Sequence, residues 1–176
     1  MNDLYINWKQ YYQAIESLAI KIYQSKWKFD YIICIAKGGL RLGDILSRIY
    51  DLPLGVLFVS SYRDINDRVR KEIKFSEHLA ILERKLEGRI LLVDDLVDSG
   101  VSLELSIAWL QKRFEANTCE IRTAVLWYKN SSIVVPDFYV EYLDNNPWIH
   151  QPFEYYETIT PEQLLSLNSS NQVEIE

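Results

Sequence analysis

The stretch ILLVDDLVDSGVSL, residues 90–103, joins two features that attract opposite kinds of ligand. A short apolar run, typical of a buried strand, leads directly into Asp94 and Asp95. Four residues later a turn of small residues, 99–102, stands where a helix would begin. Neighbouring carboxylates repel anions, whereas backbone N–H groups, hydroxyls and a helix N-terminus attract them. The stretch therefore predicts a strand, a turn and a helix that together bind one ligand. One end of that ligand would be anionic, and the other would carry hydrogen-bond donors or a cation.

The chain on either side of this stretch alternates between strand and helix patterns. We expect strands at 31–36, 54–62, 89–93, 120–128 and 137–142, and helices at 8–25, 40–50 and 102–114. Asn7 is a suitable cap for the first helix. The residues expected to face the core are Leu40, Ile45, Leu46 and Ile49 in the second helix, and Leu103, Ile107, Leu110 and Phe114 in the third. This alternation predicts an α/β domain with a mostly parallel, twisted sheet flanked by helices, and ligands at the carboxyl ends of its strands.

Three segments do not fit this alternation. The segment 63–72 is charged and aperiodic, which is typical of a loop. The segment 73–86 is compatible with either a strand or a helix. The tail from Asn168 onward is expected to fray.

Composition and charge exclude several classes of protein. A chain of 176 residues is long enough for one domain with its own core. Its net charge of −6 disfavours a nucleic-acid partner, because such binding depends on clustered Lys and Arg. No run approaches the roughly 18 apolar residues of a membrane segment, and the start lacks a signal-peptide pattern, so we expect a cytoplasmic protein. With only Cys34 and Cys119, a zinc site is not expected.

A sugar phosphate satisfies both halves of the opening stretch. The chain between Asp95 and Ser99 can span at most about 13 Å. Ribose hydroxyls can donate hydrogen bonds to the two carboxylates while a 5-phosphate lies on the turn. A solvated strand end is the alternative, but adjacent like charges cost stability unless a cation or a hydrogen-bond donor meets them. The Gly-Lys-Ser/Thr signature of a Walker loop is missing.

The segment LLVDDLVDSGVS resembles the phosphoribosyl-pyrophosphate (PRPP) motif of type I phosphoribosyltransferases. The segment IAKGGL (35–40) resembles the pyrophosphate loop of that family, and SSYRDINDRVRKE (60–72) resembles its flexible hood. WYKN, VVPDFYV and PWIHQPFE resemble the purine-binding end of the short bacterial and archaeal xanthine-guanine and hypoxanthine-guanine enzymes. The resemblance runs from about Asn7 to Tyr156. It implies a single phosphoribosyltransferase domain, 1–176, with a hood at about 60–76 and a base-binding region at about 127–156.

The resemblance implies roles for residues of the opening stretch. Asp94 and Asp95 would hold the ribose diol, directly or through Mg²⁺. The 5-phosphate would be bound by Asp98, Ser99, Gly100, Val101 and Ser102. Asp98 would also act as the catalytic residue that exchanges a proton with the purine N7. The alternative for Asp98 is an ordinary acid near a helix N-terminus.

Lys37, Gly38 and Gly39 would bind pyrophosphate through a charge and close backbone approach. An ordinary strand-to-helix turn also uses paired glycines. The family more often has arginine where this chain has Lys37, so pyrophosphate binding here would depend more on the backbone.

The base would be bound by Lys129, Trp148 and Ile149. Lys129 would donate to a purine 6-oxo group, and Trp148 would stack on the ring. Packing in the core is the alternative for the tryptophan, and an ordinary surface position is the alternative for the lysine. His150 stands where the xanthine-guanine enzymes tend to carry an acid, which bears on selection at the purine 2-position. The hood would contribute polar and basic side chains, namely Ser60, Ser61, Tyr62, Arg63, Arg68, Arg70 and Lys71.

The resemblance as a whole implies an enzyme that transfers the phosphoribosyl group of Mg²⁺-bound PRPP to guanine, xanthine or hypoxanthine. Its partners would be PRPP, a purine base and further copies of itself in a dimer or larger assembly. One alternative is a regulator of the same fold that senses nucleotides without catalysis. A signalling receiver domain fits less well, because its acidic pair belongs near the start of the chain and its phosphate acceptor on another strand.

Overall fold

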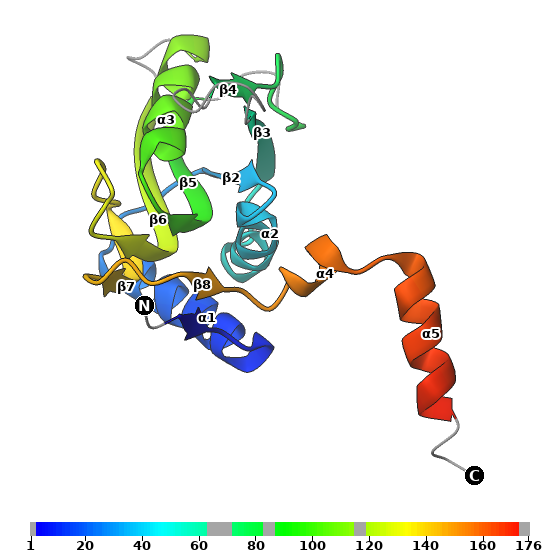
Figure 1. Ribbon diagram of the computed structural model, residues 1–176. Helices are drawn as coiled ribbons and strands as arrows, with labels where there is room; N and C mark the ends of the chain where they lie inside the picture. The colour runs from blue at the N-terminus through cyan, green and yellow to red at the C-terminus, as the bar shows by residue number, and fades with distance from the viewer. Residues whose placement is uncertain (1–2, 63–71, 83–86, 115–118, 173–176) are drawn as a thin grey trace. The chain divides into compact units, whose positions relative to one another are not determined.

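The computed structural model describes residues 3–62, 72–82, 87–114 and 119–172 (Figure 1). The chain divides into two compact units. The sheet unit is Gln13–Asn146, and the terminal unit is Met1–Tyr12 together with Pro147–Glu176.

The sheet unit is built on six strands in the order β4-β3-β2-β5-β6-β7. All neighbours pair in parallel except β3 and β4. This arrangement confirms the predicted α/β fold with its mostly parallel sheet. The strands are β2 (Tyr31–Ala36), β3 (Leu54–Tyr62), β4 (Glu72–Phe75), β5 (Gly88–Val97), β6 (Cys119–Lys129) and β7 (Phe138–Leu143).

Strand β5 is longer than the sequence predicts and contains the acidic pair. Its pairing with β2 ends at Val93, whereas its pairing with β6 continues as far as Val97. The prediction that Asp94 and Asp95 follow the strand is therefore wrong, because hydrogen bonds to β6 extend the strand beyond its apolar run. Strand order reverses between β2 and β5, and parallel sheets bind ligands at such a switch point.

Helices cover both faces of the sheet. On one face α2 (Gly39–Tyr50) packs against β2, and a Cβ on Gly43 would lie 2.7 Å from Cβ of Cys34. On the other face α3 (Val101–Arg113) buries Leu103 and Leu110 in a core shared with alternate residues of β2. Ile107 and Phe114 pack against the same core, as predicted.

One prediction about α2 is wrong, because the side chain of Ile49 is 51% exposed. Leu40 and Ile45 are only partly buried, and Leu46 alone of the four predicted residues is buried. The buried stripe consists of Gly39, Leu42, Gly43 and Leu46. The two glycines let the helix approach the sheet closely, so the stripe cannot be recognised from large apolar residues alone.

The predicted first helix is confirmed as α1 (Trp8–Gln24). The Asn7 side chain accepts from the Gln10 N–H, and the Gln10 side chain accepts from the Asn7 N–H, each at 2.9 Å. This reciprocal capping box explains why the helix begins at Trp8.

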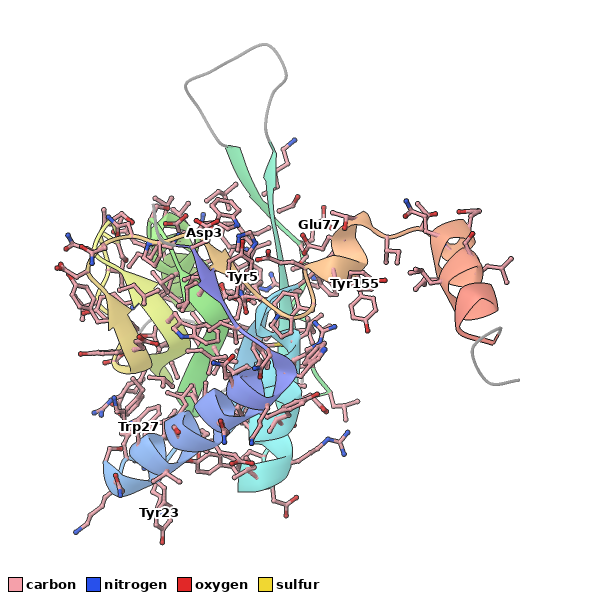
Figure 2. The ribbon with its side chains drawn as sticks, turned by 60° about the horizontal axis from the view of Figure 1, so that its bottom comes forward. Asp3, Tyr5, Tyr23, Trp27, Glu77 and Tyr155 are labelled. Atoms are coloured by element: carbon pink, nitrogen blue, oxygen red, sulfur yellow. The ribbon has the colours of Figure 1, made fainter. Side chains whose placement is uncertain are left out.

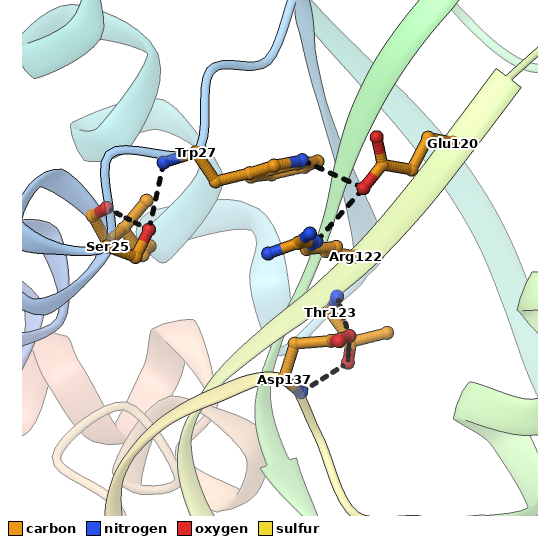
Figure 3. Close-up of polar contacts among 7 residues, drawn as sticks. Ser25, Trp27, Glu120, Arg122, Thr123 and Asp137 are labelled. Atoms are coloured by element: carbon orange, nitrogen blue, oxygen red, sulfur yellow. Dashed lines mark hydrogen bonds and ion pairs between the residues drawn. The ribbon is translucent and has the colours of Figure 1, made fainter.

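A reciprocal link fixes the beginning of β7 against β6 (Figure 3). The Asp137 carboxylate accepts from the N–H and the hydroxyl of Thr123, both at 2.8 Å, while its own N–H donates to that hydroxyl at 2.9 Å. The same view shows the Trp27 indole and the Arg122 guanidinium donating to Glu120. These contacts lie in the amino-terminal half of β6.

The terminal unit contains elements that the sequence patterns do not indicate. Strand β1 (Leu4–Tyr5) pairs in parallel with β8 (Ile149–His150), and α4 (Tyr155–Thr158) and α5 (Pro161–Gln172) follow. Figure 2 shows the Tyr155 side chain on α4. A capping box between Thr160 and Gln163 starts α5, which continues past Asn168 into the segment expected to fray. None of the helices in the described ranges is long and apolar enough to cross a bilayer.

In the segment that the sequence leaves open, 73–86, residues 73–75 belong to strand β4 and residues 76–82 have no helix or strand. An isolated bridge joins Ala80 to Val56. Residues 83–86 and most of the predicted hood, 63–71, lie outside the described residues.

Candidate functional site at the carboxyl ends of β2, β5 and β6

The loop after β2 and the acidic pair of β5 lie against each other. A Cβ on Gly38 would lie 2.7 Å from Cγ of Asp95, and one on Gly39 would lie 2.7 Å from the carbonyl oxygen of Val93. A side chain at Gly39 would push the loop away from the backbone of β5, whereas one at Gly38 would displace the Asp95 side chain. The peptide bond between Ala36 and Lys37 is cis. The paired glycines therefore bring Lys37 and its loop to the acidic pair, two features that the sequence separates by more than fifty residues.

The acidic pair carries an electrostatic cost. Asp95 is buried, and its N–H donates to the Asp94 carboxylate at 3.0 Å. Burial and, to a smaller extent, the neighbouring Asp95 charge raise the pKa of Asp94 well above its usual value. Backbone hydrogen bonds from Asp95 and Gly39 counteract part of that shift. A ligand that supplies hydroxyl donors or a cation would relieve this cost.

The donor set suits Mg²⁺ only when a substrate completes it. Within the part of the chain that the structure describes, no group of three or more His, Cys, Asp or Glu side chains could hold a metal ion. Mg²⁺ is commonly bound by one or two carboxylates, with substrate oxygens and water supplying the remaining ligands. Asp94 and Asp95 fit that pattern.

The turn after β5 forms a cradle at the beginning of α3. Gly100 is buried with φ +82°, in the left-handed region that glycine adopts without strain. Asp98 and Ser99 are exposed on one side of it, and Val101 and Ser102 open the helix. The structure thus confirms the strand–turn–helix geometry and leaves the backbone N–H groups at the first turn available for an anion.

Lys129, at the end of β6, meets Asp98 across this turn. Its Nζ lies 3.4 Å from Oδ1 of Asp98, and the lysine side chain is only 7% exposed, whereas that of Asp98 is 63% exposed. A buried ammonium is therefore paired with an accessible carboxylate. The sequence suggests each residue separately, and the parallel pairing of β5 with β6 brings them together.

Ser131 belongs to the same cluster and was missed by the sequence patterns. Its hydroxyl lies 3.1 Å from the carbonyl oxygen of Asp98 and 3.4 Å from Oδ1 of that residue. The only available signal is a serine two residues after Lys129, at the carboxyl end of a strand.

Two predicted base-binding residues, Trp148 and Ile149, belong to the terminal unit. Trp148 is 60% exposed, whereas Ile149 is buried in the short strand β8. His150 lies between two carboxylates, with Nε2 3.2 Å from Asp3 and Nδ1 3.6 Å from Glu154. Its ring stacks on Tyr5 of β1, and Figure 2 labels Tyr5 on this strand and Asp3 just before it.

Only part of the predicted hood lies within the described residues. Ser60 is exposed on β3, and the backbones of Ser61 and Tyr62 pair with β4. Arg63, Arg68, Arg70 and Lys71 lie outside the described residues.

Residues 3–158 match the family model of the phosphoribosyl transferase domain. The chain is 34% identical to a purine phosphoribosyltransferase from Pyrococcus horikoshii Ot3, covering 87% of this chain and 94% of that one with a TM-score of 0.71. The xanthine-guanine-hypoxanthine phosphoribosyltransferase of Helicobacter pylori is 24% identical, with 96% and 99% covered and a TM-score of 0.72, and it shows the fold alone. The same holds for a Neisseria gonorrhoeae protein with bound ppGpp, which is 20% identical with 97% and 99% covered and a TM-score of 0.67.

Proposed function

The chain belongs to the phosphoribosyltransferase family and is a phosphoribosyltransferase, and from this premise we propose that its acceptor is a 6-oxopurine. In the proposed reaction the phosphoribosyl group of PRPP passes to guanine, xanthine or hypoxanthine. The products are the nucleoside monophosphate and pyrophosphate. The relative from P. horikoshii, which is named as a purine phosphoribosyltransferase, supports this acceptor class.

The pairing of Lys129 with Asp98 at 3.4 Å is the observation that carries the proposal. A 6-oxopurine presents the O6 acceptor and N7 side by side on one edge. Lys129 can donate to O6 while Asp98 faces N7, so one donor and one acceptor match that edge. Adenine would instead direct its own 6-amino donor at the ammonium. The cluster therefore favours oxopurines over adenine.

The chemistry requires orientation and charge balance more than covalent participation by the protein. The purine N9 attacks the anomeric carbon, the bond from that carbon to pyrophosphate breaks, and the electron pair leaves with pyrophosphate. As N9 donates its electron pair to the anomeric carbon, the N7–H becomes more acidic, and Asp98 accepts the proton from N7. The turn 99–102 holds the 5-phosphate, and Lys37 with the Gly38 backbone holds pyrophosphate.

Asp94 and Asp95 bind the ribose diol, directly or through Mg²⁺. Magnesium bound with PRPP would reduce the negative charge of the leaving pyrophosphate. Contacts of Trp148 and Ile149 with the base remain predictions, as does assembly into dimers or larger oligomers.

An acceptor assay tests the proposal directly. The protein is supplied with PRPP, Mg²⁺ and one base at a time, and pyrophosphate release is measured for hypoxanthine, guanine, xanthine, adenine and orotate. We expect turnover with at least one oxopurine and much less with adenine or orotate. Turnover restricted to a base other than an oxopurine would overturn the acceptor assignment. Binding of PRPP without any turnover would favour the sensing regulator instead.

Replacing Lys129 with glutamine should weaken the choice between oxopurines and adenine. The amide oxygen of glutamine can accept from the 6-amino group of adenine, whereas the ammonium of lysine only donates. We expect the ratio of kcat/KM for hypoxanthine to that for adenine to fall at least about tenfold, equivalent to about 1.4 kcal/mol. Steady-state kinetics on both bases measures the ratio. An unchanged ratio with lower activity on both bases would mean that Lys129 does not read position 6.

Substitutions at the two glycines should have different effects. An alanine at Gly38 meets the end of the Asp95 side chain, which can turn away, so we expect the KM for PRPP to rise about tenfold with little change in Tm. An alanine at Gly39 meets the backbone of β5, which cannot yield locally, so Tm should fall. Kinetics and thermal unfolding of both variants distinguish these effects. Equal losses of Tm would contradict the difference between the two sites.

A further inference from the structure

The turn that follows Lys129 contacts the loop 98–100 at successive residues. The Ser131 hydroxyl lies 3.1 Å from the backbone oxygen of Asp98, and the Ile133 N–H donates to the backbone oxygen of Ser99 at 3.0 Å. A Cβ on Gly100 would lie 2.6 Å from Oγ of Ser132. The turn therefore contacts the full length of the loop.

We propose that Ser131 is a positioning residue that orients the Asp98 carboxylate for proton exchange with the base. The inference rests on the proposed function, in which Asp98 faces N7. The Ser131 hydroxyl lies within hydrogen-bond distance of both the backbone oxygen and Oδ1 of Asp98, at 3.1 and 3.4 Å. Its single hydrogen is shared between these two oxygens, so the hydroxyl couples the direction of the Asp98 side chain to the position of the Asp98 backbone.

The backbone around Ser131 is itself held by hydrogen bonds to residues at and after the end of β7. Its N–H donates to the Asn146 side chain at 3.0 Å. The neighbouring Asn130 donates its N–H to the carbonyl of Leu143 at 3.1 Å and accepts from the Tyr142 hydroxyl at 2.7 Å. These contacts fix the backbone that carries the Ser131 hydroxyl. A donor held in this way can impose an orientation on its acceptor.

Lys129 alone cannot supply this orientation. An ammonium is a compact charge with three equivalent, rotatable donors, so it attracts a carboxylate without fixing the plane of that group. The Asp98 side chain is mostly exposed and is not confined by packing. General acid–base catalysis requires the carboxylate to lie within hydrogen-bond reach and in line with the nitrogen. The hydroxyl adds the directional contact that the ion pair lacks.

The test compares Ser131→Ala with Ser131→Thr, which retains a hydroxyl, and with Ser47→Ala. Ser47 lies in α2 and donates to Asp44 at 2.8 Å, so its variant removes an equivalent hydroxyl outside the site. We expect Ser131→Ala to lower kcat about tenfold, because one hydrogen bond to a charged group is lost, with the KM for PRPP within about twofold. Ser131→Thr should recover most of kcat, and Ser47→Ala should match the parent.

A kcat of Ser131→Ala within twofold of the parent would overturn the inference, and so would equal losses in the alanine and threonine variants. A second readout is the ¹³C signal of the Asp98 γ-carboxyl, assigned by its absence in Asp98→Asn. If the parent transfers phosphoribosyl to no base, the proposed function fails and this signal decides the role of Ser131. A signal that moves in Ser131→Ala but not in Ser131→Thr or Ser47→Ala supports positioning. A signal unchanged in all three excludes it.

Discussion

Replacing Asp98 with asparagine should lower kcat about 100-fold or more while the protein remains folded, because a positioned acid–base group contributes about 10²–10⁴-fold. Asparagine is nearly isosteric and its amide oxygen can still accept from Ser131. It cannot take the N7 proton, and it removes the charge opposite Lys129. The expected loss therefore lies in the chemical step. Single-turnover kinetics with the preferred base and saturating PRPP measures it.

Asp51→Asn is a matched control for Asp98→Asn. Asp51 is exposed at the C-cap of α2 with φ +52°, a conformation that asparagine adopts readily. The same chemical change there should leave both kcat and Tm close to those of the parent. If Asp98→Asn retained kcat within about threefold of the parent, Asp98 would not be the proton acceptor and the helix-terminus interpretation would stand.

The features predicted most accurately from the sequence are those carried by one continuous segment. The acidic pair, the turn and the beginning of α3 follow one another along the chain, so their spacing determines their geometry. Strong apolar runs likewise predict the central strands, because a buried parallel strand is apolar on both faces. The glycines after β2 were predicted to let the backbone approach pyrophosphate, which stays a prediction, and the structure adds their close approach to β5.

The features that were missed depend on contacts between segments. Ser131 reaches Asp98 only because β5 and β6 pair in a particular register, and no local pattern encodes that register. The side chain of Ile49 points outward because Gly39 and Gly43 lie on the buried face of α2. A search for large apolar residues at helical spacing does not include glycines, so it selects the wrong face. Helix α5 was missed because its described side chains are all exposed and its cap is the main signal.

The second large effect is expected from Asp94→Asn, which should weaken PRPP binding at least about 100-fold. Asparagine can accept from a ribose hydroxyl, but it supplies no charge for Mg²⁺ and leaves Asp95 as the single carboxylate. Calorimetric titration with PRPP and Mg²⁺ measures the affinity. The control is Asp44→Asn, because Asp44 pairs with Arg48 on the surface of α2. This variant should bind PRPP like the parent. Equal affinities in the parent and Asp94→Asn would remove this residue from the binding site.

The same substitution should stabilise the unliganded protein at neutral pH. Burial raises the pKa of Asp94 above its unfolded value, so its favourable contribution is complete below the unfolded pKa and is lost as pH rises through the folded pKa. At neutral pH the charged carboxylate therefore costs stability that asparagine restores, about 1 kcal/mol or about 2–4 °C in Tm. Thermal unfolding without ligand should show equal Tm values near pH 4 and a gap that widens toward pH 8. A lower Tm for Asp94→Asn at pH 8 would mean that the Asp94 carboxylate stabilises the fold. A higher Tm together with lost PRPP binding would mean that Asp94 serves ligand binding at the expense of stability.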